Sequence, residues 1–412
     1  MSRFADLGGN WGNGAKSGSR YVNTNTATNS NSNNGGRGVC YDLQALCTHH
    51  SAVQADHTRW SAWLSSFGKH TTGSGYLRSS LERNADPAFM GKKHKRLFDR
   101  IISKDNFHDA YLKTRKGKRK SMGYLEFKEY GALNLERLRQ EVADGGYTRA
   151  EFRSFYIFDP KLRLISGLPF RDRIVQHALN NTLEPIYLPQ FLPYTFACIP
   201  GKGTHAGVKY VQSQLRKGRI THFLKTDFSK YFPSVHCPTL YGIHDKKIHC
   251  RRTMALMENI QPREDTGVAI GSLKSQLNAN LYGTLADDFV HHTLKPIAWA
   301  RYMDDIVLMD NDSGRLREMK DRLEAFADES MRLRFSKWSI APISRGIDFL
   351  GYRIWPRHKL VRKQSATRAK RTIKALRKRG DQYALDKFLA AWVGHISWAD
   401  SHNLMAHLEI ER

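Results

Sequence analysis

The amino-acid sequence predicts an α+β fold that starts near Met90 and continues to the C-terminus. Short segments rich in apolar and aromatic residues, typical of strands, occur at HFLKTDFSKYF, WARYMDDIVLM and DFLGYRIW. Several stretches between and around them carry apolar residues at the spacing of amphipathic helices. Residues 1–89 show neither pattern clearly. We therefore expect a domain boundary at about residue 90.

The elements expected after this boundary include helices and a strand pair. FRSFYIFD and KLRLISGLPF are predicted to be two strands joined at Pro160, and the Asp144-Gly145-Gly146 turn is predicted to end the helix before them. Helical spacing and basic or amphipathic composition predict helices over 90–119, 124–142, 170–188, 272–290, 314–330 and 362–412. The last of these ranges is expected to hold several basic helices around a small apolar core.

The N-terminal segment has a different composition. Residues 8–38 read GGNWGNGAKSGSRYVNTNTATNSNSNNGGRG and show no period of 2 or 3.6. Such a composition is typical of a loop-rich or disordered tail. Residues 39–89 hold only short apolar pieces, so no element is predicted there.

The charge of the chain indicates a polyanionic partner. Lys and Arg number 66 against 39 acidic residues, a formal net charge of +27, and most of the excess follows residue 89. A compact chain with this charge repels itself, which favours nucleic acid as partner. No apolar run reaches the roughly 18 residues of a membrane span. The five cysteines lack framework spacing, so we expect a reduced, cytoplasmic protein without membrane partners.

Three carboxylates carry the strongest chemical signal. Asp227 lies in a strand-like segment, and Asp304 and Asp305 interrupt two apolar half-strands. Adjacent carboxylates at a buried hairpin repel each other and are costly to desolvate, and divalent cations relieve both penalties. Carboxylates from neighbouring strands suit a pair of Mg²⁺ ions that assist phosphoryl transfer. The alternative is a solvated Asp-Asp turn on a surface hairpin.

These motifs resemble those of reverse transcriptases. Tyr302-Met303-Asp304-Asp305 is similar to the YxDD box of the polymerase palm, and Asp227-Phe228-Ser229-Lys230-Tyr231-Phe232 is similar to the preceding palm motif. Further motifs follow the family's order: Arg163, Pro169 and Arg171-Asp172-Arg173; FACIPGKGTHAGV at 196–208; and FLGY at 349–352. The resemblance implies a right-hand polymerase, with fingers and an antiparallel palm sheet with helices over 90–352 and a basic helical thumb over 353–412.

The resemblance also assigns roles to residues. Two Mg²⁺ ions would be held by Asp227, Asp304, Asp305 and the backbone carbonyl of Phe228. The incoming deoxynucleotide would be contacted by Lys161, Arg163, Phe232, Ile270, Gly271, Gln276 and Lys337. Template and primer would be contacted by Arg171, Arg173, Ser275, Tyr302, Met303 and Gly351.

Three of these roles have a physical rationale and an ordinary alternative. Arg163 offers a fixed cation for a triphosphate, or is a solvated strand residue. Phe232 would clash with a 2′-hydroxyl and select deoxynucleotides, or is a core residue. Lys337 would protonate the leaving pyrophosphate, or is a surface lysine.

The segment Ile-Gly-Ser-Leu-Lys-Ser-Gln at 270–276 indicates which group of reverse transcriptases the chain resembles. Most reverse transcriptases carry Gln before this Gly and Pro after the second Ser, where this chain has Ile270 and Gln276. The departure resembles the reverse transcriptases of diversity-generating retroelements, whose copying of adenine is error-prone. A branched apolar side chain removes the hydrogen bonds of an amide, so a wrong base loses less relative to the right one. The alternative is a neutral change at a pocket wall.

The N-terminal segment is similar to the C-terminal tail of the lectin-like proteins that these retroelements diversify. Asn codons supply mutable adenines, and the template repeat lies beside the polymerase gene in such elements. We therefore interpret residues 1–89 as translated template-repeat and spacer sequence, with the working polymerase starting near Met90. The alternative is a genuine flexible tail.

The sequence as a whole predicts an RNA-directed DNA polymerase of mutagenic retrohoming, in a bacterial or phage-infected cell. It would copy template-repeat RNA into adenine-mutagenised cDNA, and its partners would be template RNA, the RNA–DNA duplex, dNTPs and a small basic accessory protein. One alternative is a group II intron or retron-type reverse transcriptase. Ile270 and Gln276 argue against it, and so does the short stretch after Tyr352, because the intron type normally carries a maturase region there. The others are an inactive polymerase fold that binds RNA, and a lectin-like ligand-binding protein.

Overall fold

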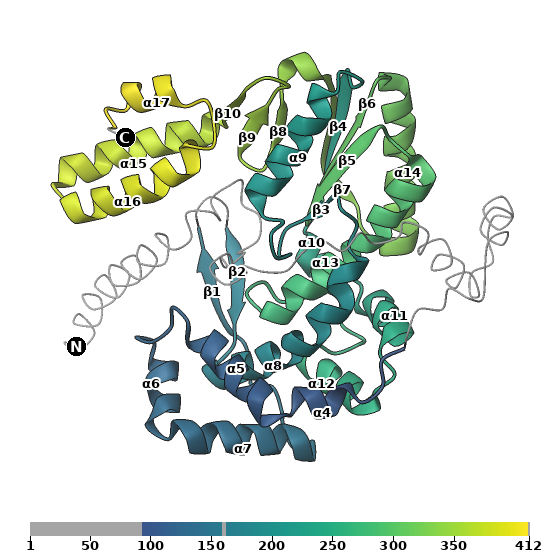
Figure 1. Cartoon of the computed structure of the whole chain (residues 1–412), viewed down its shortest axis with the longest axis vertical. Coiled ribbons are helices and arrows are strands. Elements are labelled where there is room, and N and C mark those ends of the chain that lie inside the picture. The colour runs from purple at the N-terminus through teal and green to yellow at the C-terminus, as the bar shows by residue number, and fades with distance from the viewer. Residues whose placement is uncertain (1–92, 159–161, 411–412) are drawn as a thin grey trace, which may run out of the picture.

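The computed structural model describes residues 93–158 and 162–410 as a mixture of helices and strands (Figure 1). This arrangement confirms the predicted α+β class. The interpretation of residues 1–89 and the role predicted for Lys161 concern parts of the chain that lie outside the described residues. No helix in the described ranges is long and apolar enough to cross a membrane.

The centre of the molecule is a mixed sheet, which we call the main sheet. Its strand order within the described residues is β3-β5-β6-β4-β7. β4 pairs antiparallel with both β6 and β7, β5 pairs antiparallel with β6, and β3 runs parallel to β5. The bounds are β3 Thr195–Phe196, β4 His222–Phe228, β5 Ala298–Tyr302, β6 Asp305–Asp310 and β7 Phe335–Pro342.

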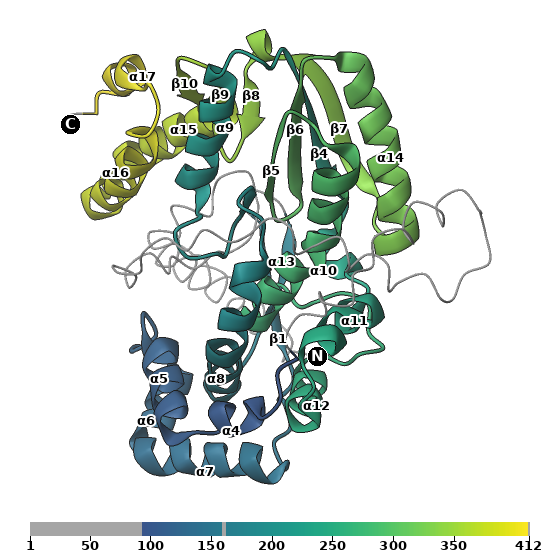
Figure 2. The same cartoon turned by 45° about the vertical axis from the view of Figure 1, so that its right-hand side comes forward.

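Two helices, α14 (Ser313–Met331) and α9 (Thr204–Arg216), cover the main sheet, and a third, α13 (Leu273–Asp288), lies below it. α14 contacts β4, β6 and β7, and α9 contacts β3 and β5. α13 is buried along nearly its whole length, with even its polar Asn278, Asn280 and Thr284 enclosed. It lies between the main sheet and the helices below it in Figures 1 and 2. A helix enclosed on all sides must satisfy its polar groups internally.

A helical region lies at the opposite end from the top of the main sheet (Figure 1). α8 (Phe170–Tyr187) is its buried centre, and the hairpin β1–β2 projects from it towards the main sheet. Their bounds and those of the surrounding helices are α4 Leu97–Ile101, α5 Lys104–Arg115, α6 Met122–Glu129, α7 Gly131–Asp144, β1 Arg153–Ile157, β2 Arg163–Gly167, η2 Leu188–Gln190, α10 Tyr231–Ser234, α11 Cys237–Lys247 and α12 Arg251–Ile260.

The chain ends in a separate helical unit, residues 363–410, which we call the C-terminal cluster. A small antiparallel sheet, in the order β10-β9-β8, leads into it. The cluster has its own apolar core, which includes Ile373, Leu385 and Ile396. The bounds of this part are η4 Ile343–Arg345, β8 Ile347–Phe349, β9 Tyr352–Ile354, β10 Lys359–Val361, α15 Lys363–Arg379, α16 Gln382–Ile396 and α17 His402–His407. The short helical segment η3 (Phe289–Leu294) instead continues α13 and contacts α14 beside the main sheet.

Most predicted elements are present, with two corrections. The central sheet was expected to be antiparallel, but β3 runs parallel to β5, so the sheet is mixed. The helix expected over 124–142 is divided into α6 and α7 at Tyr130, whose backbone leaves the helical region at φ −121° and ψ 45°. Gly131 follows, and glycine lowers the helical preference at such a break. The expected end of this helix is confirmed, because Gly145 adopts φ 80° there.

Candidate active site

The hairpin between β5 and β6 places the Asp pair at one end of the main sheet. All residues of both strands are buried. Met303 turns the chain with φ 56°, a conformation costly for a residue with a side chain. The backbone N–H of Phe228 donates to the carbonyl of Asp304 at 3.2 Å, which ties this turn to the end of β4.

Asp227 stands directly opposite Asp305 across the β4–β6 pair. On the other side of β4, Lys337 is its register partner. Asp227 and Asp304 are half-buried, whereas Asp305 is fully buried and its Oδ2 lies 3.9 Å from Nζ of Lys225. The structure therefore brings the three predicted carboxylates to one end of two paired strands.

The donor chemistry of this end suits a hard divalent cation, because carboxylate oxygens are its preferred protein ligands. Neighbouring residues on paired antiparallel strands have Cα atoms roughly 4.5–5.5 Å apart, so one cation can reach Asp227 and its neighbours. Within residues 93–158 and 162–410, no three or more His, Cys, Asp or Glu side chains are grouped so that they could bind one metal ion. Asp227, Asp304 and Asp305 lie at the same end of the sheet but do not form such a group by themselves.

A buried ion pair behind the hairpin was not predicted from the sequence. Arg301 is fully buried, and its guanidinium donates to both carboxylate oxygens of Asp287 at 2.6 and 2.8 Å. It also donates to the carbonyls of Met303 and Asn280, each at 3.1 Å. Arg301 therefore fixes the Met303 turn to α13.

The sequence did carry a signal for this pair. Arg301 interrupts the apolar segment WARYM, and Asp287 and Asp288 interrupt the buried end of α13. Buried charges are rarely tolerated without partners, so each implied the other. Burial, together with the Asp287 charge, raises the pKa of Asp288 well above its usual range.

Three of the residues predicted to contact the nucleotide, Arg163, Ile270 and Gly271, lie on two segments that contact each other. Arg163 is half-buried at the start of β2, and the N–H of Ser166 in the same strand donates to the carbonyl of Ile270 at 2.7 Å. Gly271 adopts φ +108°, and a Cβ there would lie 2.9 Å from the side chain of Ile165. The Ile270–Gly271 segment is therefore docked against the strand that carries Arg163.

The remaining predicted nucleotide contacts are more scattered. Gln276, half-buried on α13, accepts a hydrogen bond from the thiol of Cys198 at 3.7 Å. Phe232 is partly buried in α10, close after Asp227 in the chain, and its ring meets that of Tyr231 edge-on at 6.1 Å. Lys337 is exposed on β7 opposite Asp227.

The predicted template and primer residues occupy three places. Arg171 and Arg173 lie on the first turn of α8, where Arg171 pairs with Glu141 at 2.5 Å and Arg173 donates to the carbonyl of Leu168 at 3.0 Å. Ser275 is buried on α13. The other three belong to the turns beside the sheets, with Tyr302 and Met303 buried at the β5–β6 hairpin and Gly351 at φ 88° in the β8–β9 turn.

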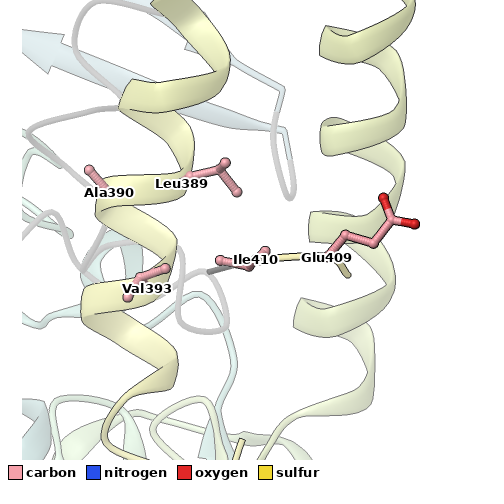
Figure 3. Close-up of a pocket in the computed structure, with 5 residues that line it drawn as sticks. All are labelled: Leu389, Ala390, Val393, Glu409 and Ile410. Atoms are coloured by element: carbon pink, nitrogen blue, oxygen red, sulfur yellow. The ribbon is translucent and has the colours of Figure 1, made fainter. Parts of the chain in front are cut away.

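One cavity lies apart from all of these residues. It has a volume of about 480 Å³ and is bounded by α16 and the end of the described chain (Figure 3). Its lining residues are Leu389, Ala390, Val393, Glu409 and Ile410. Since none of them was predicted to act in the site, the carboxylate end of the main sheet stays the candidate active site.

Comparison with known families defines the class of this site. Residues 158–354 match the family described as "Reverse transcriptase (RNA-dependent DNA polymerase)". This range contains the paired strands with Asp227, Asp304 and Asp305, and it ends at the last residue of β9. The chain carries a reverse transcriptase domain and is an RNA-directed DNA polymerase, which implies an RNA template and dNTP substrates.

Individual relatives include a protein encoded by a group II intron. The chain is 22% identical to "Group II intron-encoded protein LtrA" of Lactococcus lactis subsp. cremoris over 414 residues, which covers 79% of this chain and 68% of that protein. It is 25% identical to "Protein YkfC" of Escherichia coli over 283 residues, covering 57% and 73%. An uncharacterized 91 kDa protein in a cob intron of Schizosaccharomyces pombe is 24% identical over 245 residues, covering 54% and 30%. The domain is thus homologous to group II intron reverse transcriptases.

Proposed function

We propose that this polymerase serves a diversity-generating retroelement and copies a template-repeat RNA into cDNA with errors concentrated opposite adenine. The observation that carries the proposal is the segment 270–276. Its backbone contacts Ile165 and Ser166 of β2, the strand that begins at Arg163, and it carries a branched apolar side chain at Ile270 where most reverse transcriptases have an amide.

The side chain of Ile270 has no hydrogen-bonding group, and this affects how strongly the site can discriminate between bases. An amide at this position could hydrogen-bond to a correctly placed nucleotide and would be left unsatisfied by a misplaced one. Sites built on hydrogen bonds reject wrong substrates strongly, whereas apolar walls discriminate by only about 10- to 200-fold. Ile270 therefore lowers the free-energy difference between right and wrong base, and Gln276 on α13 completes the altered wall.

We assign the parts of the molecule to a right hand. The helical region with the β1–β2 hairpin forms the fingers, the main sheet with α9, α13 and α14 forms the palm, and the C-terminal cluster forms the thumb. The supporting observation is the position of the carboxylates on the main sheet, with the hairpin reaching towards it (Figure 1).

The carboxylate end of the main sheet would carry out nucleotide addition. Asp227, Asp304, Asp305 and the carbonyl of Phe228 would hold two Mg²⁺ ions, which when bound stabilise the attacking and leaving oxygens of the displacement. Arg163 would bind the triphosphate through its planar donor group. The exposed position of Lys337 opposite Asp227 fits a proton donor to pyrophosphate.

The other predicted contacts would place the substrates. Phe232 follows Asp227 by one short turn, so its ring would lie beneath the sugar and exclude a 2′-hydroxyl. Arg171 and Arg173 at the start of α8 would contact the template, together with Ser275, Tyr302, Met303 and Gly351. A small basic accessory protein would deliver the retroelement RNA.

A second candidate is a group II intron-type reverse transcriptase. The match to LtrA over 79% of this chain favours it. It differs from the first proposal in fidelity, because an intron-encoded enzyme has no requirement for errors at adenine.

Primer extension on an RNA template, followed by sequencing of the cDNA, tests these proposals. We expect synthesis that needs a divalent metal, with misincorporation concentrated opposite adenine and reduced in Ile270→Gln. Asp304→Ala is the inactive control. Accurate synthesis by the wild-type chain would favour the intron-type candidate, and no synthesis even with native RNA and accessory protein would contradict both.

A further inference from the structure

Gln176 links α8 to the start of α13. It lies on α8, far in sequence from the segment 270–273, and its side chain is 1% exposed. Its Nε2 donates to Oγ of Ser272 at 2.9 Å, and its Oε1 accepts from the backbone N–H of Leu273 at 3.0 Å. One amide thus contacts two consecutive residues at the start of α13.

This contact replaces an ordinary helix cap. The first N–H groups of a helix have no partner within it, and a Ser at the preceding position usually accepts from one of them. Ser272 occupies that position but makes no such bond to α13. The remote amide of Gln176 supplies the acceptor instead, so the start of α13 depends on α8 for its position.

The segment before the helix is held independently. The carbonyl of Ile270 accepts from Ser166 on β2, and Gly271 packs so closely on Ile165 and Ser166 that a Cβ would not fit without displacement. Ile270 and Gly271 are thus fixed from the β2 side, and Ser272 and Leu273 from the α8 side. Removing either attachment frees one end of the wall that faces the nucleotide.

We propose that Gln176 is a positioning residue that holds the Ile270–Leu273 segment in place, and thereby sets nucleotide affinity and the template-base selectivity of errors. The second half of this inference rests on the proposed error-prone function, and the first half does not. Gln176 contacts no substrate itself and acts through Ser272 and Leu273.

The test compares variants in steady-state addition of one nucleotide to a primer on an RNA template. Gln176→Met keeps the side-chain length and removes both hydrogen bonds, so we expect the KM for dNTP to rise about 5- to 30-fold with kcat within about twofold. Gln176→Glu keeps acceptors for Leu273 N–H and the Ser272 hydroxyl, and should restore KM to within about threefold of wild type. Ser272→Ala removes one bond and should give an intermediate rise.

Gln212 provides a matched control. It is also a buried glutamine on a helix, and it donates to the carbonyl of Trp355 at 3.2 Å, outside the 270–273 segment. Gln212→Met should leave the KM for dNTP unchanged. A KM in Gln176→Met equal to that of Gln212→Met would overturn the proposal, as would an unchanged KM in Ser272→Ala if Gln176→Met does not fold.

Sequencing of the cDNA separates this inference from the proposed function. In Gln176→Met, the ratio of errors opposite adenine to errors opposite guanine should fall towards one, because Ile270 is no longer held in one place. If the wild-type enzyme shows no adenine bias, the retroelement proposal fails, while the KM comparison still decides the role of Gln176.

Discussion

The main sheet and the C-terminal cluster are held together in different ways. The strands β5 and β6 are buried throughout, and the buried Arg301–Asp287 pair and the Arg315–Asp310 pair brace the β5–β6 hairpin at either end. The C-terminal cluster has a much smaller core of its own, separate from the main one. A rigid sheet suits a site that must hold reacting atoms in place, and a helical unit with a small core of its own would suit the duplex-binding role that we propose for the C-terminal cluster.

The junction between the two regions combines apolar, polar and aromatic contacts, and Val361 packs against both cores. The hydroxyl of Tyr352 in β9 donates to the carbonyl of His395 in α16 at 2.8 Å. The rings of His205 and Trp398 stack with centroids 3.9 Å apart, and Lys209 lies 4.7 Å from the centre of the Trp398 ring. Because the cluster has its own small core, we expect it to loosen before the main sheet unfolds.

The largest expected effect is a difference in catalytic rate between substitutions at the two ends of β6, Asp305 and Asp310. Asp305→Asn should lower RNA-templated nucleotide addition by about 1000-fold, because it removes a charge from the carboxylate end of the sheet. Asp310 is equally buried at the other end of the strand and pairs with Arg315. Asp310→Asn should lower the melting temperature and leave the rate within about twofold. Both rates are measured in single-turnover addition. An equal loss of rate in the two variants would contradict a catalytic role that is confined to the Asp305 end of β6.

The next comparison is between alanine substitutions of a buried isoleucine in the C-terminal cluster and of one in the main sheet. Ile396 is fully buried in the core of the C-terminal cluster, so Ile396→Ala should cost about 2–5 kcal/mol locally. We expect shorter cDNA products with single-nucleotide addition preserved at saturating primer–template. Ile306→Ala, beside Asp305 in β6, should instead reduce single-nucleotide addition. If Ile396→Ala slows single additions as much as Ile306→Ala, the two regions are not independent.

Acid should act on the C-terminal cluster through His395. Burial, with a smaller contribution from His205, lowers the pKa of His395 to about 4. Because the unfolded chain binds this proton near pH 6.5, the stabilisation is present above that pH and is lost as the pH falls towards 4, by about 2 kcal/mol at pH 5. Hydrogen exchange in α16 at pH 7.5 and 5 measures the loss. His395→Gln should flatten this dependence, and an unchanged dependence would assign it to another group.

The smallest effect concerns the basic surface of α15. Exposed Lys374 is one of a series on this helix that also includes Lys363, Arg368, Lys370, Arg371, Arg377, Lys378 and Arg379. If Lys374 contacts a phosphate, Lys374→Gln should reduce the salt dependence of RNA–DNA duplex binding by about 0.9 in log–log slope. Arg322→Gln on α14, at the other side of the main sheet in Figure 1, should leave the slope unchanged.

The sequence predicted the parts of the site that lie close together in the chain. The Asp304-Asp305 pair within an apolar segment indicated a buried hairpin, and the strand-like context of Asp227 indicated its partner. Gln176 was not predicted, because its contacts with Ser272 and Leu273 join segments far apart in sequence and no local pattern reports them. The break at Tyr130 was missed because the apolar spacing continues through it, so the period alone predicts one helix.

The most direct test of the account is the single-turnover incorporation of each dNTP opposite template adenine and opposite template guanine, in the wild-type enzyme and Ile270→Gln. We predict weak discrimination between correct and incorrect dNTP opposite adenine and stronger discrimination opposite guanine. In Ile270→Gln, the discrimination opposite adenine should increase at least about tenfold. Equal discrimination at the two template bases in the wild-type enzyme, unchanged by Ile270→Gln, would contradict the role assigned to the 270–276 segment.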